Sequence, residues 1–167
     1  MTIPWLKPDE VQNYGLWLQS GAIFFSLMGV IIAIRANRKI ARRRATLDLI
    51  MTLQSNEFLV KQRQEFNALR DAGNIVQWAA LDKASSPEQS TLRATMNRYE
   101  LIAIGIKEKT IDGRVYKRYA RSGVIQDWCA CKPWVMQMRQ NHSKPVYYCE
   151  VEALAKKWST KAERDHC

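Results

Sequence analysis

The chain has 167 residues and a mass of 19.4 kDa, and it carries a formal net charge of +10. This length accommodates one domain with an appendage and excludes a multidomain enzyme. With 7 Gly, 5 Pro and 47% apolar residues, the composition excludes a collagen-like chain and a fully disordered one. Its 4 Cys are too few for a disulfide-stabilised scaffold.

The first element is an apolar run without any charged residue, from Tyr14 to Ile34. As a helix rising about 1.5 Å per residue it would be ~31 Å long, which matches the hydrocarbon core of a bilayer. Trp17 stands near one end of the run, where aromatic side chains favour the headgroup region. We therefore predict a transmembrane helix at 14–34. The alternative is a helix buried in a soluble core, which is seldom so long and so free of charge.

The charges on either side of the run predict its orientation. One lysine and two acidic residues precede the run, whereas six basic residues follow it. Cationic segments stay in the cytoplasm, and a cleaved signal peptide would carry its positive charge before the apolar run. We expect an uncleaved single-span protein, with residues 1–13 as a short extracytoplasmic tail and the rest of the chain after the span in the cytoplasm. The juxtamembrane segment 35–46 also has the charge to contact anionic lipid headgroups, and its basic residues are Arg35, Arg38, Lys39, Arg42, Arg43 and Arg44.

Small side chains form one stripe along the predicted span, at alternating steps of four and three residues. Such a stripe lets two helices approach closely, and its glutamine can hydrogen-bond across the contact. We expect the protein to form a homo-oligomer through this face. Because Gly and Ala are common in single spans, a chance pattern is the alternative. The stripe consists of Gly15, Gln19, Ala22, Ser26, Gly29 and Ala33.

Downstream of the span we predict an all-α cytoplasmic domain at 47–162, followed by a short tail at 163–167. Neither Pro nor Gly interrupts residues 30–72, so one helix can run unbroken from about residue 11 to residue 72, although the sequence does not decide whether it does. A short helix is expected at 75–83. Alternating strand patterns are absent.

Capping and turn signals divide the rest of the domain. Ser86, Pro87 and Gln89 form the signature of a capping box, which predicts a helix reaching about Lys109. Asp112-Gly113 predicts a turn. The expected fold is a small helical bundle attached to a long membrane helix. The remaining helical segments are expected after Gly113 with a break at Ser122-Gly123, at 132–141, and at 146–161.

Three sequence blocks carry a family resemblance: RRRATLDLI after the span, RYELIAIGIKEKTIDGRVYKRYARSGVIQDW in the middle, and KPWVMQMRQN with YYCEVEALAKKW at the end. Together they resemble a family of bacterial single-span proteins described only as a domain of unknown function, over about residues 10–160. The resemblance implies an anchored, helical cytoplasmic domain and offers no catalytic residues to transfer. It also implies bacterial and mobile-element contexts, which make phage defence or superinfection exclusion a setting to consider.

A second basic cluster occupies one face of a predicted helix, at spacings of three, four and seven residues. Such a face can contact the phosphates of lipid or of nucleic acid, or it can be ordinary solvated surface. Residues 45–167 carry 19 basic and 14 acidic side chains, and this mild excess argues against a nucleic-acid partner. The cluster consists of Arg114, Lys117, Arg118 and Arg121.

Neither a cofactor nor a metal is expected. Motifs for nucleotide binding, zinc proteolysis and a nucleophile elbow are absent from the sequence. Glu100 lies in a mostly apolar run, where a carboxylate can have a functional role but is more simply the exposed position of an amphipathic helix beside a basic neighbour. The Cys-x-Cys spacing does not match a zinc knuckle. In a reducing cytoplasm we expect free thiols at Cys129, Cys131, Cys149 and Cys167.

These features together predict a non-enzymatic membrane protein. Its span would self-associate, and its helical domain would be presented to a protein partner that the sequence does not identify. Two alternatives belong to other classes of function. One is a membrane-acting effector in phage defence or exclusion, and the other is a membrane-tethered nucleic-acid binder.

Overall fold

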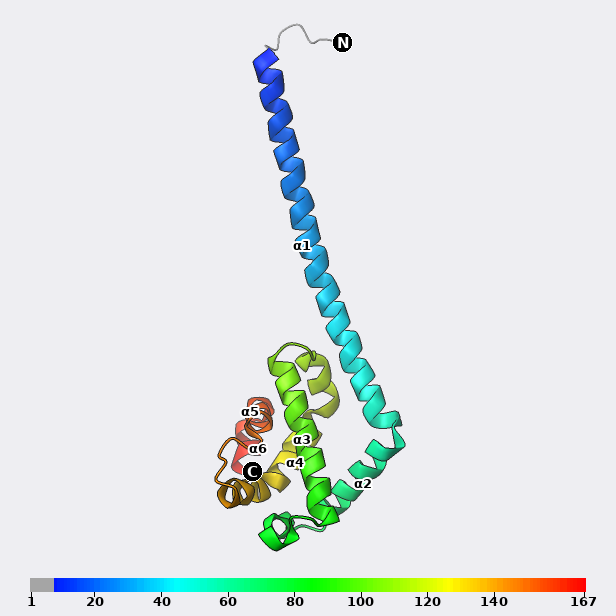
Figure 1. The fold of residues 1–167 in the computed structure, drawn as a ribbon, viewed down its shortest axis with the longest axis vertical. Helices are drawn as coiled ribbons and strands as arrows, with labels where there is room; N and C mark the ends of the chain where they lie inside the picture. The colour runs from blue at the N-terminus through cyan, green and yellow to red at the C-terminus, as the bar shows by residue number, and fades with distance from the viewer. Residues whose placement is uncertain (1–7) are drawn as a thin grey trace. The chain divides into compact units, whose positions relative to one another are not determined.

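The computed structural model of the chain describes residues 8–167; from 8 to 16, only Tyr14 is described beyond its backbone. The described residues form helices and no β-strand (Figure 1), which confirms the all-α prediction. Residues 1–7 of the predicted outer tail lie outside the described residues. The helices are α1 (Pro8–Ser55), α2 (Glu57–Asp71), η1 (Ile75–Ala79), η2 (Leu81–Lys83), α3 (Pro87–Lys107), α4 (Gly113–Asn141), α5 (Cys149–Trp158) and α6 (Lys161–Asp165).

The chain divides into two compact units, one reaching to Ala41 and the other formed by Arg42–Cys167. The described part of the first unit belongs to α1, and Trp17–Ser55 contains the one helical stretch there that is long and apolar enough to cross a membrane. None of its most apolar window is buried against other parts of the chain. This apolar window is therefore not part of the core of the folded domain.

The helix does not run unbroken from 11 to 72, because the chain leaves the helical conformation at Asn56. The Asn56 backbone is extended, and its side-chain oxygen accepts a hydrogen bond from the backbone N–H of Leu59 at 3.2 Å. Asparagine competes with the helix for backbone hydrogen bonds and is a favoured N-cap. A helix can thus end and restart there without Gly or Pro.

The ends of α2 and α3 follow the predicted signals. Gly73 and Asn74 adopt positive φ values of 70° and 58° and end α2, as predicted. The expected short helix at 75–83 is two separate 3₁₀ turns, η1 and η2.

Ser86 caps α3 as expected. The Gln89 side chain instead donates to the sulfur of Met138 at 3.8 Å, so the predicted capping box does not form.

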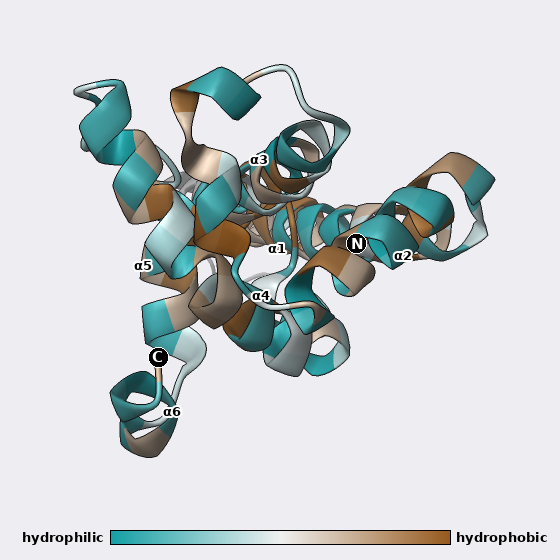
Figure 2. Cartoon of the chain, turned by 90° about the horizontal axis from the view of Figure 1, so that it is seen from below, coloured by the Kyte–Doolittle hydropathy of each residue, from teal (hydrophilic) through white to brown (hydrophobic). Residues whose placement is uncertain are grey.

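The helix α4 is continuous, so the predicted break at Ser122-Gly123 and the separate helix beginning at Lys132-Pro133 are wrong. Trp128 and Trp134, on either side of Pro133, are both buried. Packing along the whole helix outweighs the lost hydrogen bond of one proline. Figure 2 shows polar and apolar stretches alternating along α4 and α5, as expected for helices that bury one face.

The predicted last helix at 146–161 is shorter and is capped from outside. Tyr148 adopts a φ of 57° and offers no side-chain cap to α5. The carboxylate of Glu100, on α3, accepts hydrogen bonds from the backbone N–H groups of Glu150 at 3.2 Å and Val151 at 2.8 Å. The expectation that Glu100 is simply an exposed surface carboxylate is therefore wrong, because it caps a neighbouring helix.

Two of the four cysteines are not free thiols. Cys129 on α4 forms a disulfide with Cys167, with the two Cα atoms 4.9 Å apart. The prediction of four free thiols fails because α6 returns Cys167 to α4, a contact that sequence spacing does not reveal. Cys131 and Cys149 are free. Burial raises the pKa of the Cys131 thiol to about 12.

A fully buried carboxylate, Asp127 on α4, lies at the centre of the domain. Arg70 Nη1 lies 2.8 Å from Asp127 Oδ1, while Arg63 Nη1 pairs with Oδ2. The Tyr99 hydroxyl donates to Oδ2 at 2.6 Å and accepts from Arg63 Nη1 at 3.0 Å. Burial lowers the pKa of Arg63, but its hydrogen bonds to and charge interactions with Asp127 and Tyr99 together outweigh this effect and raise the pKa overall. This network joins α2, α3 and α4.

We predict that Asp127→Asn lowers the free energy of unfolding by about 3 kcal/mol, because two arginines lose the partner that compensates their burial. Urea unfolding of the full chain in detergent micelles, followed by circular dichroism, measures the change. Asp82→Asn is the matched control, since Asp82 is exposed on η2. A loss as small as that of the control would contradict the central role of Asp127.

Candidate functional site

A basic pocket lies where the last turns of α1 meet the start of α4 and the end of α5. It has a volume of about 370 Å³, and its wall holds four cations and one acidic residue. We call it the basic pocket. It combines a residue of the juxtamembrane cluster with two residues of the second basic cluster. Its lining residues are Arg42, Ile106, Ile111, Asp112, Gly113, Arg114, Lys117, Lys157 and Trp158.

Asp112 lines this pocket and is hydrogen-bonded to the buried Thr46. The Asp112 Oδ1 atom accepts hydrogen bonds from the backbone N–H groups of Arg114 and Val115, at 3.0 and 3.3 Å, and so caps α4. The Asp112 N–H donates to Thr46 Oγ1 at 2.8 Å, and Thr46 is fully buried. The Thr46 hydroxyl in turn donates to the carbonyl oxygen of Arg42 at 2.7 Å. The end of α1 is thereby joined to the first turn of α4.

The pocket keeps an excess of positive charge. Burial raises the pKa of Asp112, but its hydrogen bonds from Val115 and Arg114 and the nearby Arg43 outweigh burial and hold the pKa below its ordinary value. Arg43 Nε lies 3.5 Å from Asp112 Oδ2, so the single carboxylate of the pocket is already neutralised. Within the described part of the chain, no ion pair is formed by Arg114, Lys117 or Lys157.

Arg42 contributes a partly satisfied guanidinium. Its Nη1 atom donates to the carbonyl oxygen of Lys109 at 3.3 Å, while its buried Nε has no hydrogen-bond partner in the described structure. Planar guanidinium groups bind phosphate and carboxylate oxygens strongly. An arginine held in this way, beside three cations without an ion pair in the described structure, has the chemistry to bind an oxyanion.

The structure separates the four residues predicted to share one basic face. Arg114 and Lys117 line the basic pocket, and Arg118 is exposed outside it. Arg121 does not line the pocket and holds α6 instead: its Nη2 lies 2.6 Å from Glu163 Oε2, and its Nε donates to the Trp158 carbonyl at 3.2 Å. The predicted face is therefore not a single surface.

The remaining predicted residues lie along α1. Arg43 contacts the domain through Asp112, whereas Arg35, Arg38, Lys39 and Arg44 are exposed. The side-chain surroundings of Gly15 lie outside the described residues. The other stripe residues are exposed in the described structure: Gln19, Ala22, Ser26, Gly29 and Ala33.

Sequence reasoning missed Thr46, Asp112 and Lys157. Asp112 precedes a helix and could have been recognised as an N-cap. Nothing local marks Thr46 or Lys157, because their roles depend on contacts between helices distant in the sequence. Within the described residues, no three His, Cys, Asp or Glu side chains lie close enough together to hold a metal ion.

A sequence comparison matches residues 18–158 to the family described as Domain of unknown function (DUF4760). The chain belongs to this family. The match includes most of the apolar run and ends at the last residue of α5, so all residues of the basic pocket fall inside it. No curated protein and no solved structure matches the chain.

The depressed pKa of Asp112 predicts a defined acid sensitivity. A carboxyl group whose folded pKa lies below its ordinary value of 3.8 stabilises the fold above that pH, and this contribution disappears as the pH falls toward the folded pKa. We expect the free energy of unfolding to decrease below about pH 4, and to decrease less steeply in Asp112→Asn. Denaturation series between pH 7 and pH 3 measure this, with Asp82→Asn as control. Identical slopes in the wild type and Asp112→Asn would contradict the assignment.

Proposed function

We propose that the chain is a single-span protein of the bacterial inner membrane whose helical domain binds anionic lipid headgroups through the basic pocket. In this proposal the N-terminus faces outward and the domain lies in the cytoplasm, where anionic lipids attract basic segments. The exposed apolar stretch of α1 and the six basic residues after it support this orientation. The proposal gives the domain a binding role and assigns it no reaction.

The observation that carries the proposal is the convergence of two basic clusters on one pocket close to the span in sequence. Arg42 follows Ile34 by only eight residues, and a chain of that length extends at most about 28 Å in any conformation. Arg114 and Lys117, some seventy residues further along, join Arg42 in the same pocket. The pocket can therefore reach the headgroup phosphates.

The expected strength of this contact is moderate. Each basic residue near an anionic membrane surface contributes about 1 kcal/mol, and salt screens the attraction. Such binding positions a domain that its span already anchors. Lipid binding of this strength leaves the surface of the domain outside the basic pocket available to a protein partner, as the sequence predicts. The nucleic-acid alternative receives less support, because Arg121 of the predicted face is paired with Glu163.

We also propose that the span self-associates. The small-residue stripe is exposed from Gln19 to Ala33, and a Cβ atom added at Gly29 would meet nothing within 4 Å. This surface is thus free to receive a second helix at close range. A membrane-acting effector in phage defence or exclusion would need the same association, and in addition would arrest growth when overproduced.

Lysine labelling tests the lipid contact. The full chain is placed in nanodiscs of zwitterionic lipid, or of the same lipid mixed with phosphatidylglycerol, and acetylation rates are measured by mass spectrometry. We expect Lys117 and Lys157 to react several-fold more slowly in the anionic nanodiscs at low salt, and high salt to restore their rates. Lys61, exposed on α2, serves as the internal control.

Matched variants make this experiment specific. Arg114→Glu introduces a negative charge into the basic pocket and should restore the labelling of Lys157, whereas Arg118→Glu, exposed on the same helix but outside the pocket, should not. Equal labelling of Lys117 and Lys157 in both kinds of nanodisc would refute the proposed lipid contact.

Disulfide crosslinking tests the self-association of the span. Single cysteines at Ala22, Ser26, Gly29 or Ala33 in a background without native cysteines should crosslink in membranes. Controls at Phe25 and Leu27 should not, because those residues lie off the stripe. Crosslinking at all positions alike, or at none, would remove the case for a specific helix pair.

A further inference from the structure

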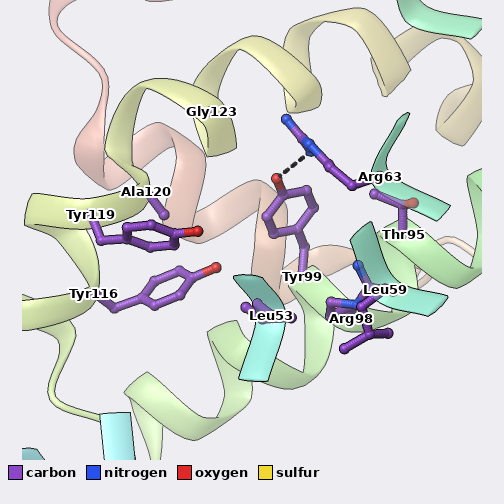
Figure 3. A pocket seen from close by; sticks show the side chains of 10 residues that line it. All are labelled: Leu53, Leu59, Arg63, Thr95, Arg98, Tyr99, Tyr116, Tyr119, Ala120 and Gly123. Atoms are coloured by element: carbon purple, nitrogen blue, oxygen red, sulfur yellow. Dashed lines mark hydrogen bonds between the residues drawn. The ribbon is translucent and has the colours of Figure 1, made fainter. Parts of the chain in front are cut away.

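A second cavity opens on the side of the domain where α2, α3 and α4 meet (Figure 3). It has a volume of about 260 Å³, and no carboxylate belongs to its wall. We call it the tyrosine cavity, because three tyrosines contribute to it. Its lining residues are Leu53, Leu59, Arg63, Thr95, Arg98, Tyr99, Tyr116, Tyr119, Ala120 and Gly123.

The polar groups of the cavity are only partly used by the fold. The Tyr99 hydroxyl is occupied by Asp127 and Arg63. Tyr116 is 2% exposed, and its hydroxyl has no hydrogen-bond partner among the described residues. Figure 3 shows the hydroxyls of Tyr116 and Tyr119 directed to the same side, toward Tyr99. The Oγ1 atom of Thr95, also 2% exposed, is buried without a partner.

The charge of the cavity is unbalanced. Arg63 is paired with Asp127, but Arg98 makes no ion pair among the described residues and hydrogen-bonds only to the neutral side-chain oxygen of Gln62. Burial lowers the pKa of Arg98, and the neighbouring Arg63 adds to this effect. A partly buried guanidinium without an acidic partner is costly unless an anion compensates it.

The chemistry of the wall defines what the cavity would accept. Burial raises the pKa of Tyr116, so its hydroxyl stays protonated and can donate a hydrogen bond to an anion. The other surfaces are tyrosine rings and the apolar side chains of Leu53 and Leu59, which suit a flat apolar body. The volume limits that body to about a single ring.

Gly123 is one of the α4 residues that line the tyrosine cavity. A Cβ atom added there would meet nothing within 4 Å, so close packing does not require a glycine at this position. A glycine inside a helix costs about 1 kcal/mol relative to alanine. The open space beside Gly123 thus belongs to the cavity, and a larger side chain there would fill it without removing any hydrogen bond.

We propose that the tyrosine cavity binds a small ring-bearing anion whose carboxylate or phosphate group is held by Arg98 and Tyr116. Carboxylate and phosphate share the oxyanion chemistry that these donors recognise. This site is separate from the basic pocket, so the inference goes beyond the proposed lipid contact and does not depend on it.

Titration calorimetry on the full chain in zwitterionic nanodiscs tests the proposal, with empty nanodiscs as the blank. The probes are phenyl phosphate, benzoate, inorganic phosphate and neutral benzyl alcohol. We expect saturable binding of phenyl phosphate or benzoate, at least tenfold weaker binding of inorganic phosphate, and no saturable binding of benzyl alcohol. Which ring-bearing anion binds more tightly identifies the oxyanion that the site prefers.

Four variants locate the binding. Arg98→Gln should weaken it at least tenfold, and Gly123→Leu should abolish it while the protein keeps its helical circular dichroism. Arg118→Gln removes an exposed charge of α4 outside the cavity, and Lys117→Glu reverses a charge of the basic pocket; both should leave the affinity unchanged. Absence of saturable binding by the wild type, unaltered affinity in Gly123→Leu, or loss of binding in Lys117→Glu would each overturn the assignment.

Discussion

The helical domain depends on the burial of one carboxylate. An ionised aspartate without water is strongly unfavourable unless several donors surround it, and Asp127 receives its donors from two other helices. Arg63 and Arg70 are seven residues apart, so they lie on the same face of α2. The end of α1 at Asn56 gives α2 a direction of its own, which lets both arginines reach α4. Hydrogen bonds at this one carboxylate join α2 and α3 to α4.

Residues that act within one turn could be predicted from the sequence. Ser86 and Pro87 mark the start of α3, and Gly73-Asn74 marks the end of α2, because caps and left-handed residues act on their own backbone. The local caps at Asn56 and Asp112 escaped prediction, and the other missed contacts join distant parts of the chain. Glu100 caps α5, which begins about fifty residues later in the sequence, and Cys129 forms a disulfide with Cys167. Pro133 is tolerated because the tryptophans on both sides of it are buried. Of the basic pocket, the sequence indicated Arg42, Arg114 and Lys117 but not their convergence.

A single helix supplies side chains to all three features. Tyr116, Tyr119 and Gly123 of α4 line the tyrosine cavity, and Asp127, one turn further on, anchors the central network. Arg114 and Lys117, on the adjacent face, belong to the basic pocket. Because Arg63 belongs to both the network and the cavity wall, the carboxylate that organises the core also orients one of the two guanidinium groups of the cavity.

The link between Cys129 and Cys167 closes a covalent ring with a sequence separation of 38, and this ring contains the whole of α5. Lys157 and Trp158, which line the basic pocket, therefore lie within it. In the chain-entropy description, a ring of this size restricts the unfolded state by about 4 kcal/mol. This stabilisation is present only while the two sulfurs are joined. The free energy of unfolding of the domain is therefore higher in an oxidising compartment than in a reducing one. Its folding equilibrium thus depends on the redox potential of the compartment that holds it.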